Sequence, residues 1–64
     1  MTLKELHKTK YPKVDMIGMF DPKNPTQPIY PEYADELIET HGDKEVLDHM
    51  YSEKKRVLVV VLKD

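Results

Sequence analysis

The chain has 64 residues, of which 34% are charged and 39% are hydrophobic, and it contains no cysteine. A chain of this length buries only about 60% of the surface that its unfolded form exposes, so the core of the single domain expected over residues 1–64 is marginal. Without cysteine it has neither a disulfide nor a cysteine zinc site to compensate. We therefore expect self-association or a partner protein to add stability. No segment has the order of a signal peptide or the length of a membrane span, which predicts a cytoplasmic protein.

The first predicted elements are a helix and a strand. Thr2 and Glu5 have the spacing of a capping box, which predicts a short helix over residues 3–10. Residues 14–20, VDMIGMF, are rich in side chains that suit a pleated surface and predict a strand. Gly18 within this strand indicates a bulge or a close approach by another part of the chain.

A proline-rich segment, DPKNPTQPIYP over residues 21–31, follows the predicted strand. Prolines at every third position suit a polyproline II path, which rises about 3.1 Å per residue and could cross a small domain. Two interpretations remain: a docking segment for an aromatic groove, or a stiff crossing loop whose reduced unfolded-state entropy favours folding. The second is the more common use of such short motifs.

Residues 32–41 have the pattern of an amphipathic helix. In PEYADELIETHG a proline comes first, acidic residues follow in the first turn, and Tyr33, Leu37 and His41 recur at every fourth position before Gly42. The acidic side chains predict a solvated helix face, or a surface that meets a basic partner.

The end of the chain predicts a hairpin. Residues 57–62, VLVVVL, are apolar on both faces of a strand, which is typical of a central strand with a neighbour on each edge. Residues 14–20 supply one neighbour, and residues 45–52 are the natural antiparallel partner on the other edge, although their spacing also fits a helix over 44–53. The predicted fold is α+β: a three-stranded sheet with 57–62 central, and two short helices that cover one face.

Candidate catalytic and metal-binding groups are few. A continuous helix over 41–49 would align His41, Glu45 and His49 as metal ligands, but Gly42 and Asp43 interrupt it. The only serine, Ser52, has no base placed beside it, and two glycines cannot form a glycine-rich phosphate loop. The sequence therefore predicts no enzymatic activity, no metal site and no cofactor.

The charges favour a protein partner. Acidic residues gather in the middle of the chain, and the predicted partner-binding residues there, with the neighbouring tyrosines, are Tyr30, Glu32, Tyr33, Asp35, Glu36, Glu39 and Asp43. Basic residues lie near the start and at the predicted hairpin turn: Lys8, Lys10, Lys13, Lys54, Lys55 and Arg56. These lysines leave nucleic-acid binding as an alternative, which the acidic helix and the scarcity of arginine disfavour.

Four segments carry a resemblance to known proteins. The opening MTLKEL, the hydrophobic strand, YADELIETHGDKEVLD and the closing RVLVVVLKD resemble in layout the short uncharacterised accessory proteins of phages and prophages of Gram-positive bacteria. The resemblance implies a protein that binds a host or phage protein in the bacterial cell, in some cases as an inhibitor. Together with the doubly apolar strand, it predicts a small, homodimeric protein-interaction module; an accessory protein that binds nucleic acid and an uncharacterised structural protein are the alternatives.

Overall fold

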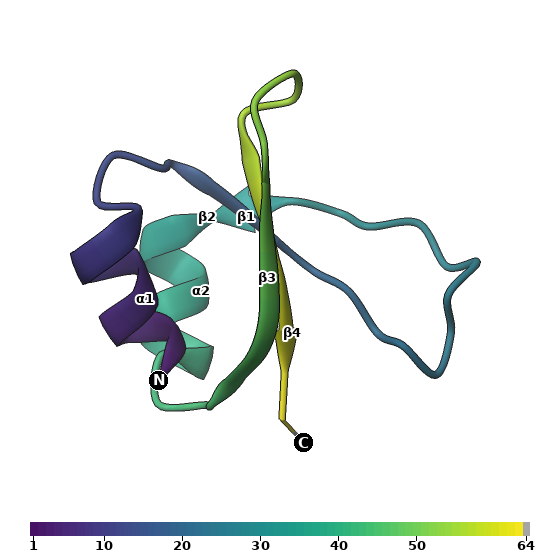
Figure 1. The fold of residues 1–64 in the computed structure, drawn as a ribbon, viewed down its shortest axis with the longest axis horizontal. Coiled ribbons are helices and arrows are strands. Elements are labelled where there is room, and N and C mark those ends of the chain that lie inside the picture. Colours follow the sequence, from purple (N-terminus) through teal and green to yellow (C-terminus); the bar gives the residue numbers. More distant parts are fainter. Residues whose placement is uncertain (64) are drawn as a thin grey trace.

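The structure is a computed structural model that describes residues 1–63. Two helices and a four-stranded sheet form a small α+β fold (Figure 1). The elements in chain order are α1 (Leu3–Lys10), β1 (Met16–Met19), β2 (Glu32–Tyr33), α2 (Ala34–His41), β3 (Val46–Ser52) and β4 (Val57–Leu62). The strands lie in the order β2-β1-β4-β3.

Strand β4 is central, as its doubly apolar sequence predicts. It pairs in parallel with β1, where Ile17 lies opposite Leu58, and antiparallel with β3, where His49 lies opposite Val60. The hairpin interpretation of the C-terminal third is therefore confirmed, and the alternative helix over 44–53 is wrong. Pairing of β3 with the central strand β4 outweighs the helical spacing of the apolar residues in β3.

Both helices cover the same face of the sheet (Figure 1). Their apolar stripes meet the residues of β1 and β4 that point to that side, and the fully buried core residues are Leu3, Leu6, Ile17, Ala34, Leu37, Leu58 and Val60. On β4 the buried positions alternate with half-buried ones, as the pleat requires. The opposite face of the sheet carries no helix.

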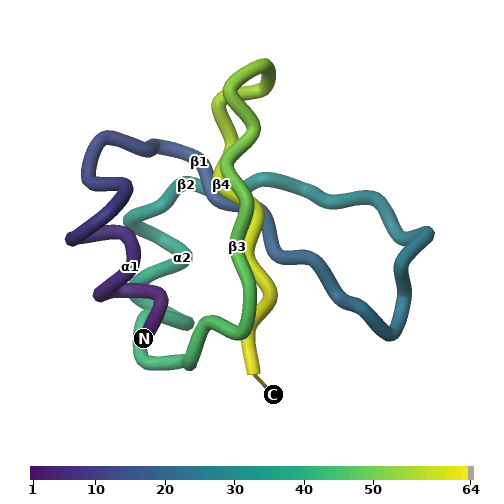
Figure 2. Tube along the Cα trace, in the orientation of Figure 1, coloured from purple at the N-terminus to yellow at the C-terminus, as the bar shows by residue number. Residues whose placement is uncertain are grey.

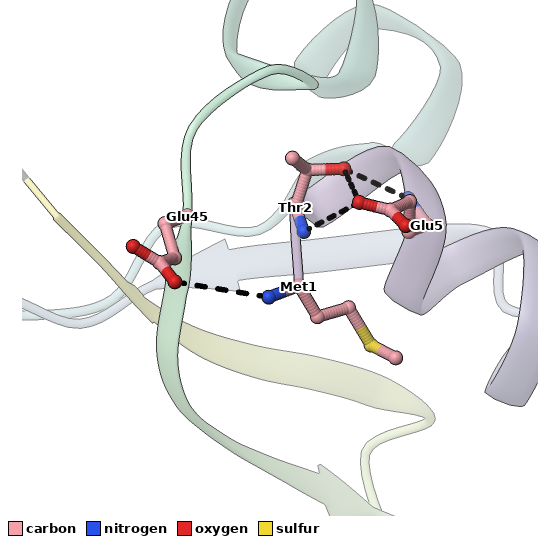
Figure 3. Close-up of polar contacts among 4 residues, drawn as sticks. All are labelled: Met1, Thr2, Glu5 and Glu45. Atoms are coloured by element: carbon pink, nitrogen blue, oxygen red, sulfur yellow. Dashed lines mark hydrogen bonds and ion pairs between the residues drawn. The ribbon is translucent and has the colours of Figure 1, made fainter.

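The capping box at the start of α1 is confirmed. The Thr2 hydroxyl accepts a hydrogen bond from the Glu5 backbone N–H at 3.2 Å, and the Glu5 carboxylate accepts one from the Thr2 N–H at 3.2 Å (Figure 3). The bond from the Thr2 N–H, together with one that the Thr2 hydroxyl donates to the same carboxylate at 3.0 Å, lowers the pKa of Glu5, because both stabilise its ionised form. The Met1 amino group lies 3.8 Å from the Glu45 carboxylate, so the segment before β3 is held beside the helix start.

The main correction to the predicted fold is a fourth strand. Residues 32 and 33 were expected in the second helix, but they form β2, which pairs antiparallel with Met16 and Ile17. Helix α2 starts only at Ala34, whose N–H donates to the Asp15 carbonyl at 2.7 Å. The chain must return to the edge of β1 before it can enter the helix. Pro31 favours an extended conformation at the preceding residue, Tyr30, which suits this return.

The first strand is shorter than the predicted 14–20. Val14 donates its N–H to Tyr11 in a turn after α1, so pairing starts only at Met16. Gly18 marks a close approach: a Cβ at this position would collide with Cγ2 of Ile29, which returns from the proline-rich loop. The predicted approach is therefore made by a side chain, and no bulge is found in this strand.

The loop over residues 21–31 connects β1 with β2 and does not follow the predicted polyproline II path through its first half. Two successive turns form there, since Asn24 donates its N–H to the Asp21 carbonyl and Gln27 donates to the Asn24 carbonyl, each at 3.0 Å. Pro22 and Pro25 take the second position of these turns, which proline favours. Hydrogen bonds from the Lys23 N–H and the Asn24 amide lower the pKa of Asp21.

Candidate protein-interaction surface

The face of the sheet that lacks helices is largely apolar, and we call it the open face. On β4 the side chains of this face alternate with the buried ones. On β1 and β3 they belong to the residues that pair with these outward positions of β4. They belong to Met16, Asp48, Met50, Ser52, Val57, Val59 and Val61, and Gly18 occupies a position on the same face without a side chain. Met50 is 66% exposed, and the three valines are half-buried. This face is therefore an apolar area that the described helices leave uncovered.

The loop over 21–31 turns one side of the open face into a groove. The loop stands out from the sheet on the side away from the helices (Figures 1 and 2). The groove between loop and sheet has a volume of about 830 Å³, and its apolar walls include Pro28, Ile29 and Tyr30 from the loop and Leu47 and Val61 from the hairpin. Charged residues also line this groove, among them Lys23, Lys44 and Lys63, so it offers both apolar and charged contacts.

The free edge of β3 is closed to further strand pairing. Leu47 has no partner on β4, because the register shifts between Val46 and Asp48, and such a bulge disrupts the ladder. At the next position the Asp48 carboxylate accepts the His49 backbone N–H at 2.8 Å, so that donor is already satisfied. Bulges and charges of this kind protect edge strands from pairing with another chain.

The seven predicted partner-binding residues are all exposed, but they do not form one cluster. Tyr30 and Glu32 line the groove beside the open face. Tyr33, Asp35 and Glu36 line a second hollow of about 440 Å³ at the start of α2, together with His7 and Asp15. Glu39 and Asp43 lie further along α2 and just after it, and neither lines a hollow that the structure describes. Whether these residues bind a partner stays a prediction.

The histidines considered as metal ligands are held apart by other contacts. The His41 ring lies 2.7 Å from the Thr40 hydroxyl, at the end of α2. The His49 ring lies on β3, where its Nδ1 is 3.3 Å from the Tyr11 hydroxyl. Among residues 1–63, no group of three or more histidine, aspartate or glutamate side chains is placed to hold a metal ion.

Sequence reasoning missed two features of the surface. Tyr11 contacts His49 edge-on and stacks on Tyr51, so that an aromatic cluster closes the core between α1 and β3. Leu47 and Met50 were assigned to the hairpin, but their exposure could not be predicted, because it depends on the register of β3. A strand apolar on both faces was the one signal that an uncovered face would exist.

Comparisons with known proteins add no family. The sequence matches no protein-family model, and neither the curated proteins nor the solved structures gave a significant match. In the part of the chain that the structure describes, neither helix has the length and apolar character needed to cross a membrane.

Proposed function

We propose that this chain is a small non-enzymatic protein-interaction module that acts by binding another protein, as phage accessory or inhibitor proteins do. The observation that supports this most is the open face. Met50 and Leu47 are 66% and 61% exposed on or beside it, in a chain whose fully buried core has only seven residues. Exposed apolar areas with polar surroundings are typical of protein interaction sites.

The ionisable groups support binding more than catalysis. Catalytic sites gather groups with shifted pKa values in a cleft. The carboxyl groups with a lowered pKa, Glu5 and Asp21, serve a helix cap and a turn, and both are exposed. Their shifts have local structural causes, and we assign neither of them a chemical role.

The acidic surface on α2 is proposed as the second contact for the partner. Asp35, Glu36 and Glu39 are exposed on the helix, and Glu32 and Asp43 lie before and after it. Helix α2 lies on the helical side of the sheet, away from the open face (Figure 1), whereas Glu32 lines the groove beside that face. A partner with a basic region would find complementary charge there, which raises association rates and favours specificity.

The test is affinity capture followed by titration of the purified captured protein. Three baits are compared: the natural chain, Met50→Lys on the open face and Glu36→Lys/Glu39→Lys on α2. We expect a bound protein whose affinity falls at least tenfold with one of the two variants, since each places a charge at a proposed contact. Equal retention of the same proteins by all three baits would reject the proposal.

A second candidate, nucleic-acid binding, is favoured by one observation. Lys54, Lys55 and Arg56 are exposed at the tip of the β3–β4 hairpin, which extends beyond the body of the fold (Figure 1). Three adjacent cations on a projecting tip could contact phosphates. A mobility-shift titration at low salt tests this, because electrostatic affinity is greatest there. Absence of a shift would remove the candidate.

A further inference from the structure

The proposed function leaves open which molecule covers the open face. We propose that a second copy of this chain covers it, in a two-fold symmetric dimer in which the loop over 21–31 of each copy lies across the β3–β4 half of the other. This inference rests on the proposed function in one respect: it assigns the open face to a second copy and leaves the acidic surface on α2 for the other protein. It goes further by naming the occupant and by giving the proline-rich loop a role.

The first argument for a second copy is the shape of the chain. The loop projects from the β1–β2 half of the sheet on the side away from the helices (Figures 1 and 2). Ile29 fixes the returning end of this projection, because it packs directly over Gly18 of β1. On the same side, the β3–β4 half carries no cover. A projection beside an uncovered half-sheet can meet its own copy across a two-fold axis, and such an interface closes with two copies.

The second argument is the composition of the loop and of the β3–β4 half that would receive it. The loop offers Pro28, Ile29 and Tyr30, and Tyr30 is 74% exposed. The half that would receive it offers Met50 and the half-buried valines of β4. Aromatic residues and methionine are enriched at interface cores. The loop is also ordered before binding by its two turns, so that less conformational entropy is lost in the complex.

The available area carries the third step. A stable interface buries about 800 Å² on each partner. The accessible surface of the chain is 5006 Å², so such an interface needs only about one sixth of it. A 64-residue chain with seven fully buried residues has a marginal core, and the buried interface would supplement it.

Stacking of the two faces is favoured over pairing of the two β3 edges. An edge-to-edge dimer needs free donors and a regular ladder along β3. The bulge at Leu47 interrupts that ladder, and the Asp48 carboxylate occupies the His49 N–H. On the open face, the Asp48 side chain lies opposite Val61 with its carboxylate bound to the His49 N–H, while Met50 and the valines of β4 are apolar.

The test is the solution mass of the full chain by light scattering coupled to size-exclusion chromatography, over a series of micromolar concentrations. We expect a mass near twice 7.5 kDa for the natural chain. Met50→Lys should shift it to the monomer mass, because a charge would be buried in the interface. Leu47→Lys is the second variant on this side. Thr9→Lys is the control, since it adds the same charge on α1, and it should remain a dimer.

The role of the loop is tested by Pro22→Gly/Pro25→Gly/Pro28→Gly, with Pro12→Gly as the control outside the loop. Loss of the preformed turns should weaken the dimer at least about tenfold, while the control leaves its dissociation constant unchanged. Circular dichroism verifies that each variant is folded. A monomeric natural chain, or a Met50→Lys dimer as tight as the natural one, would overturn the inference. An unchanged dissociation constant for the triple variant would overturn the part assigned to the loop.

The same measurements separate this inference from the proposed function. A dimer that captures no other protein supports the inference and contradicts the proposed function. A monomer that captures another protein through Met50 supports the proposed function and contradicts the inference.

Discussion

Replacing Arg56 by glycine should stabilise the protein, although it removes a side chain. Among residues 1–63, Arg56 is the only residue other than glycine with a positive φ, at 56°. It closes the turn between β3 and β4, where a left-handed residue lets the chain enter the next strand. The left-handed conformation costs a residue with a Cβ about 1–2 kcal/mol, because the Cβ crowds the following carbonyl oxygen. Glycine has no such cost.

The net gain is smaller than the relieved strain. Glycine also gives the unfolded chain more freedom, which offsets about 0.4–1 kcal/mol. We therefore expect Arg56→Gly to raise the free energy of unfolding by about 0.5–1 kcal/mol. For a domain of this size the melting temperature should rise by about 2–8 °C. Thermal unfolding by circular dichroism at a fixed protein concentration measures this change.

Lys55→Gly provides the matched control. It removes the same charge from the same turn, but Lys55 does not have a positive φ. Only the unfolded-state term then applies, so the free energy of unfolding should fall by about 0.4–1 kcal/mol. The two glycine variants should thus shift the melting temperature in opposite directions. A lower melting temperature for Arg56→Gly, or equal shifts of one sign for both, would refute the argument from backbone strain.

Three further predictions test the cap, the core and the carboxylates. Thr2→Ala removes the hydroxyl that accepts the Glu5 N–H, and urea unfolding should show a loss of about 1 kcal/mol. Leu58→Ala should cost about 2–5 kcal/mol and abolish cooperative unfolding, whereas Val59→Ala at a half-buried position should cost clearly less. Because the folded pKa values of Glu5 and Asp21 lie below their unfolded values, their stabilisation is present above the unfolded pKa and is lost as the pH falls through the folded pKa. Unfolding midpoints should therefore decrease at acidic pH, and Glu5→Gln/Asp21→Asn should reduce that decrease.

The parts of the fold that depend on local signals were predictable. The capping box of Thr2 and Glu5 predicted α1, and the apolar run of 57–62 predicted a central strand, because both signals act within a few residues. Strand β2 was not predictable, since two residues carry no periodicity and their pairing depends on where the loop returns. The open face was implied by β4, but its members on β3 follow from the register, which the sequence does not specify.

The proline spacing shows how one pattern fits two structures. A polyproline II helix repeats after three residues. Two four-residue turns that share an end residue also repeat after three, and Asp21–Pro22 and Asn24–Pro25 each begin such a turn. Asp21 decides between them, because its carboxylate binds the Lys23 N–H and the Asn24 amide, contacts that an extended path cannot make. Aspartate or asparagine before proline was therefore the more informative signal.

The same loop covers one half of the open face, the half at β1, from within the chain. Gly18 has no side chain, so Ile29 can lie against β1 and cover that half from within the chain. Strand β4 is different, because its valines alternate with the core residues Leu58 and Val60 and face a side with no helix. A central strand needs apolar residues on both faces only when both faces are buried. The apolar outer positions of β4 are therefore the feature on which the proposed dimer rests, in which the loop of a second copy would cover this half of the sheet.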